Sequence, residues 1–271
     1  MSAGRACSRA RDMPLLDRDG VAIHYEISGE GPALLLTHGY SATGEMWRGQ
    51  REAFSSRFRL ITWDMRGHGL SDSPADPAAY SEAATVADMA ALLDLASTHR
   101  AIVGGLSLGG YMSLAFHRAH PERVRALLVI DTGPGFRRDE PREAWNANAL
   151  RTAEKFETEG LARLAAGSPE MRQARHRDAR GLAQAARGML TQRDARVISS
   201  LPEIAVPALV VVGADDTPFL AAADYMAGKI PGARKAVIAG AGHAVNIDQP
   251  EAFNAAVLSF LAEAGLDRAE G

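Results

Sequence analysis

The fold class is decided by residues 101–110, which read Ala-Ile-Val-Gly-Gly-Leu-Ser-Leu-Gly-Gly. Residues 101–104 form a short apolar run, which is typical of a parallel strand covered on both faces. Residues 108–119 place Leu108, Met112 and Ala115 on one helical stripe. Ser107 therefore falls on a sharp turn between a strand and a helix, where its hydroxyl is held out of the sheet. Flanking glycines prevent a Cβ clash in such a turn, and the helix N-terminus favours negative charge beside the serine.

The rest of the chain repeats this alternation of strand and helix. Residues 21–27 alternate between apolar and polar side chains, which predicts a half-buried strand at a sheet edge. Helical spacing of apolar side chains appears at residues 82–98 and after Pro250. Short apolar runs that predict buried strands lie at residues 33–37, 60–63, 101–104, 126–130, 208–212 and 235–238. Strands that alternate with helices predict an α/β fold with a parallel, doubly wound sheet.

The alternation is interrupted once. It stops at Gly133-Pro134-Gly135 and resumes near Pro202, and the intervening stretch reads as helices only. We therefore expect residues 134–200 to be a helical lid inserted into a core made of residues 15–133 and 201–265. Residues 1–14 and 266–271 are expected to be flexible tails.

Composition limits the classes of function. The chain has 271 residues, of which 46% are hydrophobic and 23% charged, and this composition is typical of a globular protein. The net charge of −3 disfavours nucleic-acid binding. The single cysteine, Cys7, excludes an intrachain disulfide and a cysteine zinc site. No apolar run approaches the roughly 20 residues of a membrane span, and no secretory signal is present. We expect a cytoplasmic enzyme, monomeric or homodimeric, with a small-molecule substrate, no metal site and no cofactor.

A serine nucleophile needs a base, and the base needs an orienting acid. His243 lies in the glycine-rich stretch 240–245, after a predicted strand. Asp215 and Asp216 follow the predicted strand at 208–212, and Asp131 follows the one at 126–130. All of these positions lie just past the carboxyl ends of strands, where open α/β sheets place their sites. Asp215 and Asp131 remain rivals of Asp216 for the acid role.

Two further motifs strengthen this pattern: Thr37-His38-Gly39-Tyr40, and residues 64–72, which read Asp-Met-Arg-Gly-His-Gly-Leu-Ser-Asp. With them the chain resembles the α/β-hydrolase superfamily from about residue 20 to 264. The resemblance implies an eight-stranded, mostly parallel sheet with an inserted helical lid. It also implies Ser107 as nucleophile, Asp216 as acid and His243 as base. The backbone N–H groups of Tyr40 and Leu108 would form the oxyanion hole.

The substrate pocket is expected to draw on apolar side chains of the lid and of the triad loops. The candidate lining residues are His38, Phe136, Trp145, Met171, Phe219 and Val245. Arg172, Arg175, His176 and Arg180 would form a solvated basic face or, as the weaker alternative, a site for a substrate carboxylate. His24, His99 and His176 are expected at the surface.

These residues favour a serine hydrolase that cleaves a small carboxylic ester or lactone through an acyl-enzyme on Ser107. The superfamily's dehalogenases and epoxide hydrolases carry aspartate at the elbow, so Ser107 disfavours those reactions. Alternatives on the same triad are a carbon–carbon bond hydrolase, a perhydrolase and a slow-turnover ligand receptor. A lyase or cofactor-free oxygenase that uses the histidine alone is a further alternative.

Overall fold

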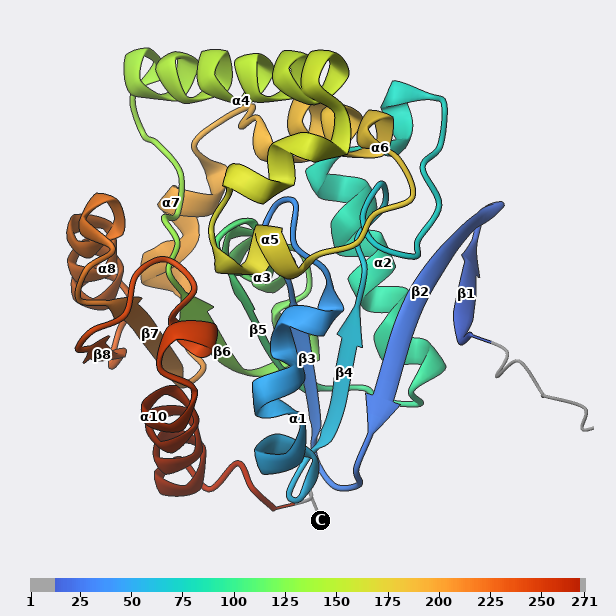
Figure 1. Ribbon diagram of the computed structural model, residues 1–271. Coiled ribbons are helices and arrows are strands. Elements are labelled where there is room, and N and C mark those ends of the chain that lie inside the picture. The colour runs from blue at the N-terminus through green and yellow to red at the C-terminus, as the bar shows by residue number, and fades with distance from the viewer. Residues whose placement is uncertain (1–12, 269–271) are drawn as a thin grey trace, which may run out of the picture.

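The structure is a computed structural model that describes residues 13–268 (Figure 1). An eight-stranded sheet runs through its centre in the order β1-β2-β4-β3-β5-β6-β7-β8. Strands β1 and β2 pair antiparallel, as do β2 and β4, and the remaining pairs are parallel. The predicted α/β class with a mostly parallel sheet is confirmed. The strands are β1 (Leu15–Arg18), β2 (Val21–Ser28), β3 (Ala33–Thr37), β4 (Arg59–Trp63), β5 (Ala101–Leu106), β6 (Val124–Ile130), β7 (Ala208–Gly213) and β8 (Arg234–Ile238).

The apolar runs of the sequence became the central strands. Every residue of β3, β5 and β7 is buried, because helices cover both faces of a parallel sheet. The sequence pattern missed β1, a strand of four residues with no distinctive periodicity. The placement of residues 21–27 at the sheet edge was consequently wrong, since β1 pairs with β2 and takes the edge itself.

Helices follow most of the strands. The last of them, α10, buries Phe253, Val257, Phe260 and Leu261, the apolar face expected from the sequence. The α-helices are α1 (Arg48–Ser55), α2 (Glu82–Leu95), α3 (Leu108–Ala119), α4 (Asp139–Glu159), α5 (Pro169–Gln173), α6 (Ala179–Ala185), α7 (Arg196–Ser200), α8 (Thr217–Lys229), α9 (Val245–Asp248) and α10 (Pro250–Glu263). Short 3-10 turns and one π-helical turn complete the chain: η1 (Gly44–Trp47), η2 (Pro77–Ala79), η3 (Pro121–Arg123), η4 (Gly160–Ala166), η5 (Ala186–Leu190, π) and η6 (Leu201–Glu203).

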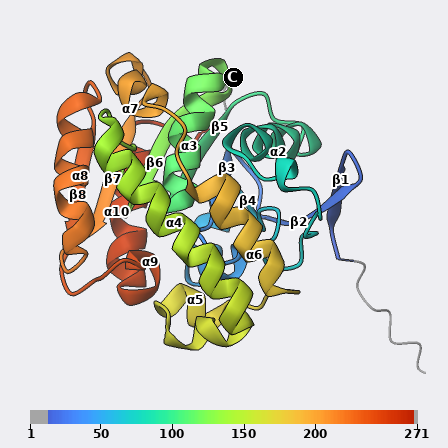
Figure 2. The ribbon, with the colours of Figure 1, turned by 90° about the horizontal axis from the view of Figure 1, so that it is seen from above.

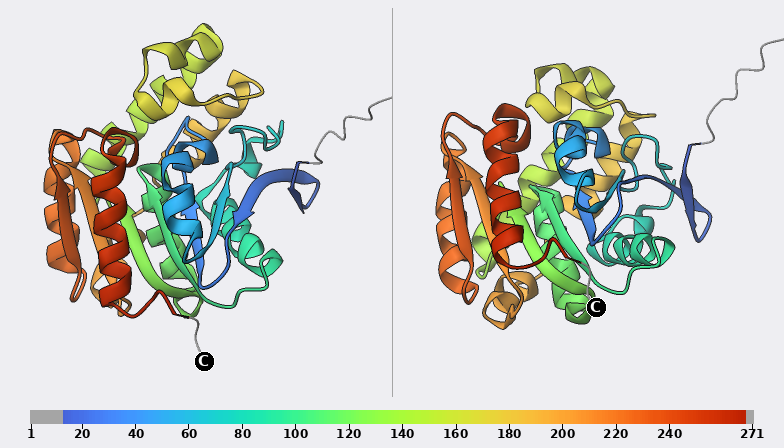
Figure 3. Two further views of the ribbon diagram at one scale, coloured as in Figure 1. Left: turned by 60° about the horizontal axis from the view of Figure 1, so that its bottom comes forward. Right: turned by 90° about the horizontal axis from the view of Figure 1, so that it is seen from below.

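The helices form one layer on each face of the sheet. Met89 of α2, Met112 of α3 and Met226 of α8 belong to the hydrophobic cluster on one face. Phe54 of α1 and Phe253 of α10 belong to the cluster on the other face. Figure 3 shows α1 and α10 side by side on that second face. The sheet is thus buried between two layers, and its carboxyl edge is left to carry the loops of a site.

The chain between β6 and β7 forms α4, α5, α6 and α7. Seen from above, α4 and α6 cross over the sheet (Figure 2). We call residues 134–200 the insertion. Its own small core contains Phe156 and Leu182, and Tyr40 of the β3 loop packs against it. The Tyr40 hydroxyl donates a hydrogen bond of 2.8 Å to the Leu182 carbonyl, which ties the insertion to the body.

The C-terminal end of the described chain packs against the body. Leu266, placed in a flexible tail by the sequence analysis, is 7% exposed and packs in the cluster of α1 and α10. Residues 1–12, with Cys7, and residues 269–271 lie outside the described residues. Within residues 13–268, no helix combines the length and apolar character that crossing a membrane requires.

Candidate active site

Ser107 occupies the turn between β5 and α3 in a strained conformation. Its φ is +56° and its ψ is −117°, outside the ordinary regions for a residue with a side chain. Three hydrogen bonds hold it there. Its N–H donates to the Ile130 carbonyl at 2.9 Å, and its carbonyl accepts from Thr132 Oγ1 at 2.7 Å and from Tyr111 N–H at 3.0 Å. A Cβ on Gly109 would lie 2.2 Å from the Thr37 carbonyl oxygen. The sequence Gly-x-Ser-x-Gly is therefore required by the close approach of β3, β5 and α3.

His243 and Asp216 form a hydrogen-bonded pair. His243 Nδ1 lies 2.8 Å from Asp216 Oδ2, and Asp216 is only 5% exposed. Its neighbour Asp215 is exposed. Of the two rivals on this loop, the geometry brings Asp216 to the histidine. With a proton on Nδ1 for this bond, the Nε2 atom of His243 is left to accept a proton.

One aromatic side chain connects this pair to the serine. The Phe219 ring stacks on the His243 imidazole, with centroids 5.0 Å apart, and Phe219 and Ser107 line the same cavity. Among residues 13–268, no hydrogen bond joins Ser107 Oγ to His243. Catalytic hydrogen bonds often tighten only when substrate binds, so this geometry is compatible with a Ser-His pair.

The third candidate acid, Asp131, is fully buried directly after β6. Its Oδ1 accepts a hydrogen bond of 2.8 Å from Gly213 N–H, and its Oδ2 accepts one of 3.3 Å from Val245 N–H. Burial raises the pKa of Asp131 to about 8, although these N–H donors and His243 oppose the rise. Asp131 thus joins the loop that carries Asp216 to the segment that follows His243.

Charge around His243 favours its protonated form. Burial lowers the pKa of His243, but the hydrogen bond and negative charge of Asp216, helped by Asp131 and Glu170, outweigh that effect. The net result is a pKa above the ordinary value of 6.5. A raised pKa suits a group that must take a proton from a hydroxyl and then hand it on.

The backbone N–H groups of Leu108 and Tyr40 are the candidate donors of an oxyanion hole. Leu108 is the first residue of α3, so its N–H has no intrahelical acceptor. Tyr40 follows Gly39, where an added Cβ would lie 3.4 Å from Ser107 Cβ. Among the described residues, neither N–H donates a hydrogen bond. Free donors beside the nucleophile suit an oxyanion hole.

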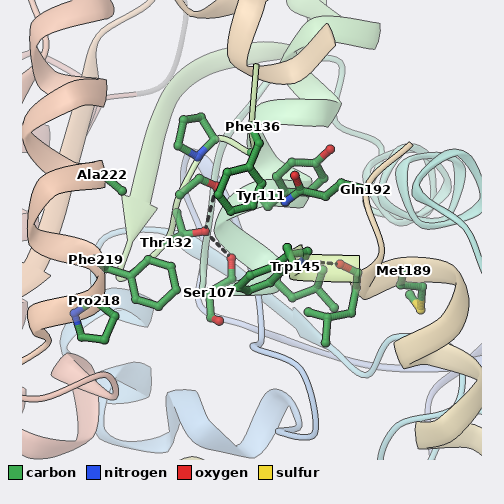
Figure 4. Close-up of a pocket in the computed structure, with 15 residues that line it drawn as sticks. Ser107, Tyr111, Thr132, Phe136, Trp145, Met189, Gln192, Pro218, Phe219 and Ala222 are labelled. Atoms are coloured by element: carbon green, nitrogen blue, oxygen red, sulfur yellow. Dashed lines mark hydrogen bonds between the residues drawn. The ribbon is translucent and has the colours of Figure 1, made fainter. Parts of the chain in front are cut away.

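A cavity of about 260 Å³ opens over Ser107 between the body and the insertion. Figure 4 shows Phe219, Pro218 and Ala222 along one side and Gln192 and Met189 along the other, with Ser107 and Thr132 between them. Within the described chain, no Lys, Arg, Asp or Glu lines it. The full lining is Ser107, Leu108, Tyr111, Thr132, Gly133, Pro134, Gly135, Phe136, Trp145, Met189, Leu190, Gln192, Pro218, Phe219 and Ala222.

The predicted pocket residues divide evenly. Phe136, Trp145 and Phe219 line the cavity. Met171 is partly buried and packs against the core of the insertion, and Val245 is fully buried in the cluster of α1 and α10. His38 is also fully buried: its Nε2 accepts from Met65 N–H at 2.9 Å, and its Nδ1 lies 2.7 Å from the Gly39 carbonyl. It supports the Gly39–Tyr40 loop from behind and does not face the cavity.

Two histidines expected at the surface are structural. His24 Nδ1 lies 3.1 Å from the Asp64 carboxylate. His176, in the insertion, accepts a hydrogen bond of 2.9 Å from Gly69 N–H, and its Nε2 lies 3.1 Å from the Ser41 carbonyl. Its ring packs against His68, which in turn packs against His38. Sequence spacing gave no signal for this contact, because the three residues come from separate segments.

The basic residues of the insertion do not enter the cavity. Arg172 and Arg175 line a separate, more polar groove beside β2. Arg177 pairs with Asp72 at 2.6 Å. Within residues 13–268, no group of three or more His, Cys, Asp and Glu side chains is arranged to hold a metal ion.

Comparisons with known proteins identify the family of this chain. Residues 34–256 match the model of the alpha/beta hydrolase family. A Bacillus subtilis protein with the provisional name 2-succinyl-6-hydroxy-2,4-cyclohexadiene-1-carboxylate synthase is 31% identical, over 90% of this chain and 96% of its own. 3-Oxoadipate enol-lactonase 2 of Acinetobacter baylyi is 31% identical, over 89% and 94%. A solved thermophilic esterase from Thermogutta terrifontis is 30% identical with a TM-score of 0.78, over 93% and 97%.

Proposed function

Because the chain belongs to the alpha/beta hydrolase family, we propose that it is a serine hydrolase that cleaves a small carboxylic ester or lactone. The observation that carries the proposal is the strained Ser107, which opens into a cavity beside the hydrogen-bonded His243–Asp216 pair. An esterase and an enol-lactonase among the relatives support this reaction class.

In the proposed first step, Ser107 Oγ attacks the substrate carbonyl carbon while His243 Nε2 takes the serine proton. The carbonyl oxygen becomes an oxyanion and accepts hydrogen bonds from the N–H groups of Leu108 and Tyr40. The Asp216 carboxylate stabilises the imidazolium that forms. Collapse of the intermediate breaks the ester C–O bond, and His243 returns the proton to the leaving alkoxide.

The second step repeats this sequence with water. His243 takes a proton from the water molecule, its oxygen attacks the acyl carbon, and the bond to Ser107 Oγ breaks. The proton passes to Ser107, which is regenerated together with a carboxylic acid. The overall change is one ester and one water converted to one acid and one alcohol. A lactone gives a single hydroxy acid.

The cavity supports an uncharged substrate. Its walls carry Phe136, Trp145 and Phe219, and no ionic side chain of the described residues faces it. A substrate carboxylate would lose its hydration there without gaining a counter-ion. We also propose that the insertion acts as the lid of this cavity, because Trp145, Met189 and Gln192 all come from it.

The reaction is tested by hydrolysis of 4-nitrophenyl acetate and butyrate. We expect multiple turnovers by the wild-type protein and a loss of roughly a thousandfold or more in Ser107→Ala, the scale of triad deletions. Ser113→Ala is the matched control: Ser113 lies in α3, with its hydroxyl bonded to the Gly109 carbonyl at 2.8 Å. It should retain turnover.

Other outcomes favour the alternatives. A single burst without turnover would favour a receptor that acylates but does not hydrolyse. No reaction with either ester would move the carbon–carbon hydrolase and lyase hypotheses ahead. Hydrolysis that survives in Ser107→Ala would overturn the proposal.

A further inference from the structure

Most polar side chains in the cavity already have hydrogen-bond partners. The Tyr111 hydroxyl donates to Glu82 Oε2 at 2.9 Å. Trp145 Nε1 donates to the Leu190 carbonyl at 2.8 Å, and Thr132 Oγ1 donates to the Ser107 carbonyl. Apart from Ser107, the remaining polar side chain of the lining is Gln192. Its wall of the cavity is otherwise apolar.

Neither atom of the Gln192 amide is hydrogen bonded within the described chain. Its Oε1 is buried without a partner, and the residue as a whole is only 9% exposed. An unpaired amide oxygen buried against apolar walls is unfavourable, because it has given up hydration without replacement. A buried polar group of this kind in a cavity calls for a ligand partner.

The backbone around Gln192 is held firmly in place. Gln192 N–H donates to Asn146 Oδ1 at 2.8 Å, and Asn146 Nδ2 donates to the Gln192 carbonyl at 2.8 Å. A Cβ on Gly135 would lie 2.8 Å from Gln192 Oε1 and 3.4 Å from a ring carbon of Tyr111. The amide thus sits against a glycine that leaves room for it, beside Tyr111 and Phe136 (Figure 4). The backbone position of Gln192 is therefore preorganised, which favours recognition of a specific group.

We propose that Gln192 determines specificity, and that the cavity takes an ester or lactone whose acyl part carries an uncharged hydroxyl or carboxamide. An amide side chain offers an acceptor oxygen and two donor hydrogens, so the matching group is one that both donates and accepts. Phe136, Trp145 and Phe219 would enclose the apolar part of the acyl chain. This inference rests on the proposed ester hydrolysis and adds to it the class of substrate.

The test uses isosteric pairs of 4-nitrophenyl esters in which a terminal methyl group is replaced by a hydroxyl: heptanoate with 6-hydroxyhexanoate, and octanoate with 7-hydroxyheptanoate. These hydroxy esters are long enough to resist spontaneous closure to a six-membered lactone. For at least one pair, wild-type kcat/KM should favour the hydroxyacyl ester by roughly tenfold, the scale of a buried hydrogen bond. In Gln192→Leu the preference should vanish or reverse. The ratio within one protein cancels any general loss of activity. Gln192→Met is a second variant in case the leucine packs poorly.

Gln173→Leu is the matched control, because Gln173 is exposed on α5, away from the cavity. It should keep the wild-type ratio. The proposal is overturned if wild type shows no preference in either pair, or if Gln192→Leu and Gln192→Met retain it.

A binding measurement separates this proposal from the hydrolytic one. Ser107→Ala is titrated by calorimetry with non-hydrolysable heptanamide and 6-hydroxyhexanamide. Roughly tenfold tighter binding of the hydroxy compound, lost on adding Gln192→Leu, would support the role of Gln192 even if esters were not hydrolysed. Equal binding of the two amides would contradict it.

Discussion

At the scale of single residues, the proposed mechanism makes activity depend on the protonation state of His243, which pairs with Asp216. His243 must be neutral to accept the Ser107 proton, and its pKa is raised above 6.5. Activity should therefore fall as pH drops, with the midpoint of kcat/KM above 6.5. In Asp216→Asn the raising influence is lost while burial remains, so the residual activity should have its midpoint at lower pH. We expect that variant to lose roughly ten-thousandfold in kcat.

The measurement is a pH–rate profile of both proteins with 4-nitrophenyl butyrate. A profile that stays flat down to pH 4 would count against His243 as the base. An unchanged midpoint in Asp216→Asn would count against Asp216 as its partner.

The hydrogen bonds of Asp131 are expected to stabilise the folded protein. Both of its carboxylate oxygens accept backbone N–H groups, from Gly213 and Val245. At pH 9, above the Asp131 pKa of about 8, the wild-type carboxyl is ionised, whereas in Asp131→Asn one of these oxygens becomes an NH₂ group that faces a donor. The free energy of unfolding should drop by about 1–3 kcal/mol, the cost of a buried donor left unpaired. Urea denaturation measures it, and an unchanged midpoint would mean that Asp131 does not join the two loops as described.

At the scale of elements, the close packing of α3 under the elbow predicts that a glycine-to-alanine substitution has opposite effects on stability in α3 and in α8. A Cβ on Gly109 would lie 2.2 Å from the Thr37 carbonyl oxygen, whereas one on Gly228 in α8 meets nothing within 4 Å. Gly228→Ala should stabilise the protein by about 0.5–1 kcal/mol through helix propensity. Gly109→Ala should destabilise it and impair hydrolysis, because the elbow must shift.

Thermal denaturation and 4-nitrophenyl butyrate turnover of the two alanine variants test this contrast. Equal melting temperatures and equal rates for Gly109→Ala and Gly228→Ala would show that the close approach of β3 and α3 does not constrain the elbow.

At the scale of the whole molecule, buried histidines predict loss of stability in acid. Burial lowers the pKa of His38 to about 4 and lowers the pKa values of His68 and His176. As pH falls through 6.5 the unfolded chain binds protons that the folded chain excludes, so the free energy of unfolding must decrease. For His38 alone the loss between pH 6.5 and 4 is about 3 kcal/mol.

Urea titrations at a series of pH values measure this decrease. His176→Gln removes one of the three groups, so stability should fall less steeply between pH 6.5 and 4 than in wild type. Unfolding free energy that is constant over this range would contradict the description of these side chains as buried and neutral.

The sequence predicted the architecture well because its signals are local. Continuous apolar runs marked β3, β5 and β7, and the glycines around Ser107 marked the elbow. The four residues of β1 offered too little pattern to register. Cytoplasmic location and the oligomeric state stay predictions.

The candidate site residues could be predicted where they lie in loops that follow recognisable strands. Ser107, Asp216 and His243 could be nominated because each lies in the turn or loop that follows a strand. The pocket was harder, because its lining is assembled from distant segments. Gln192 carries no local signal, and Val245 lies beside a catalytic candidate in sequence while its side chain points into the core. His176 looked like a surface residue until the fold placed it on Gly69 and Ser41.

The central claim is that Ser107 is a nucleophile activated by His243. The most direct measurement is labelling with an alkyl fluorophosphonate, followed by intact-mass analysis and peptide mapping. We predict one phosphonyl group per chain, on Ser107, with labelling abolished in Ser107→Ala and strongly slowed in His243→Ala. Labelling of another residue, or equal labelling of Ser107→Ala and wild type, would contradict the account.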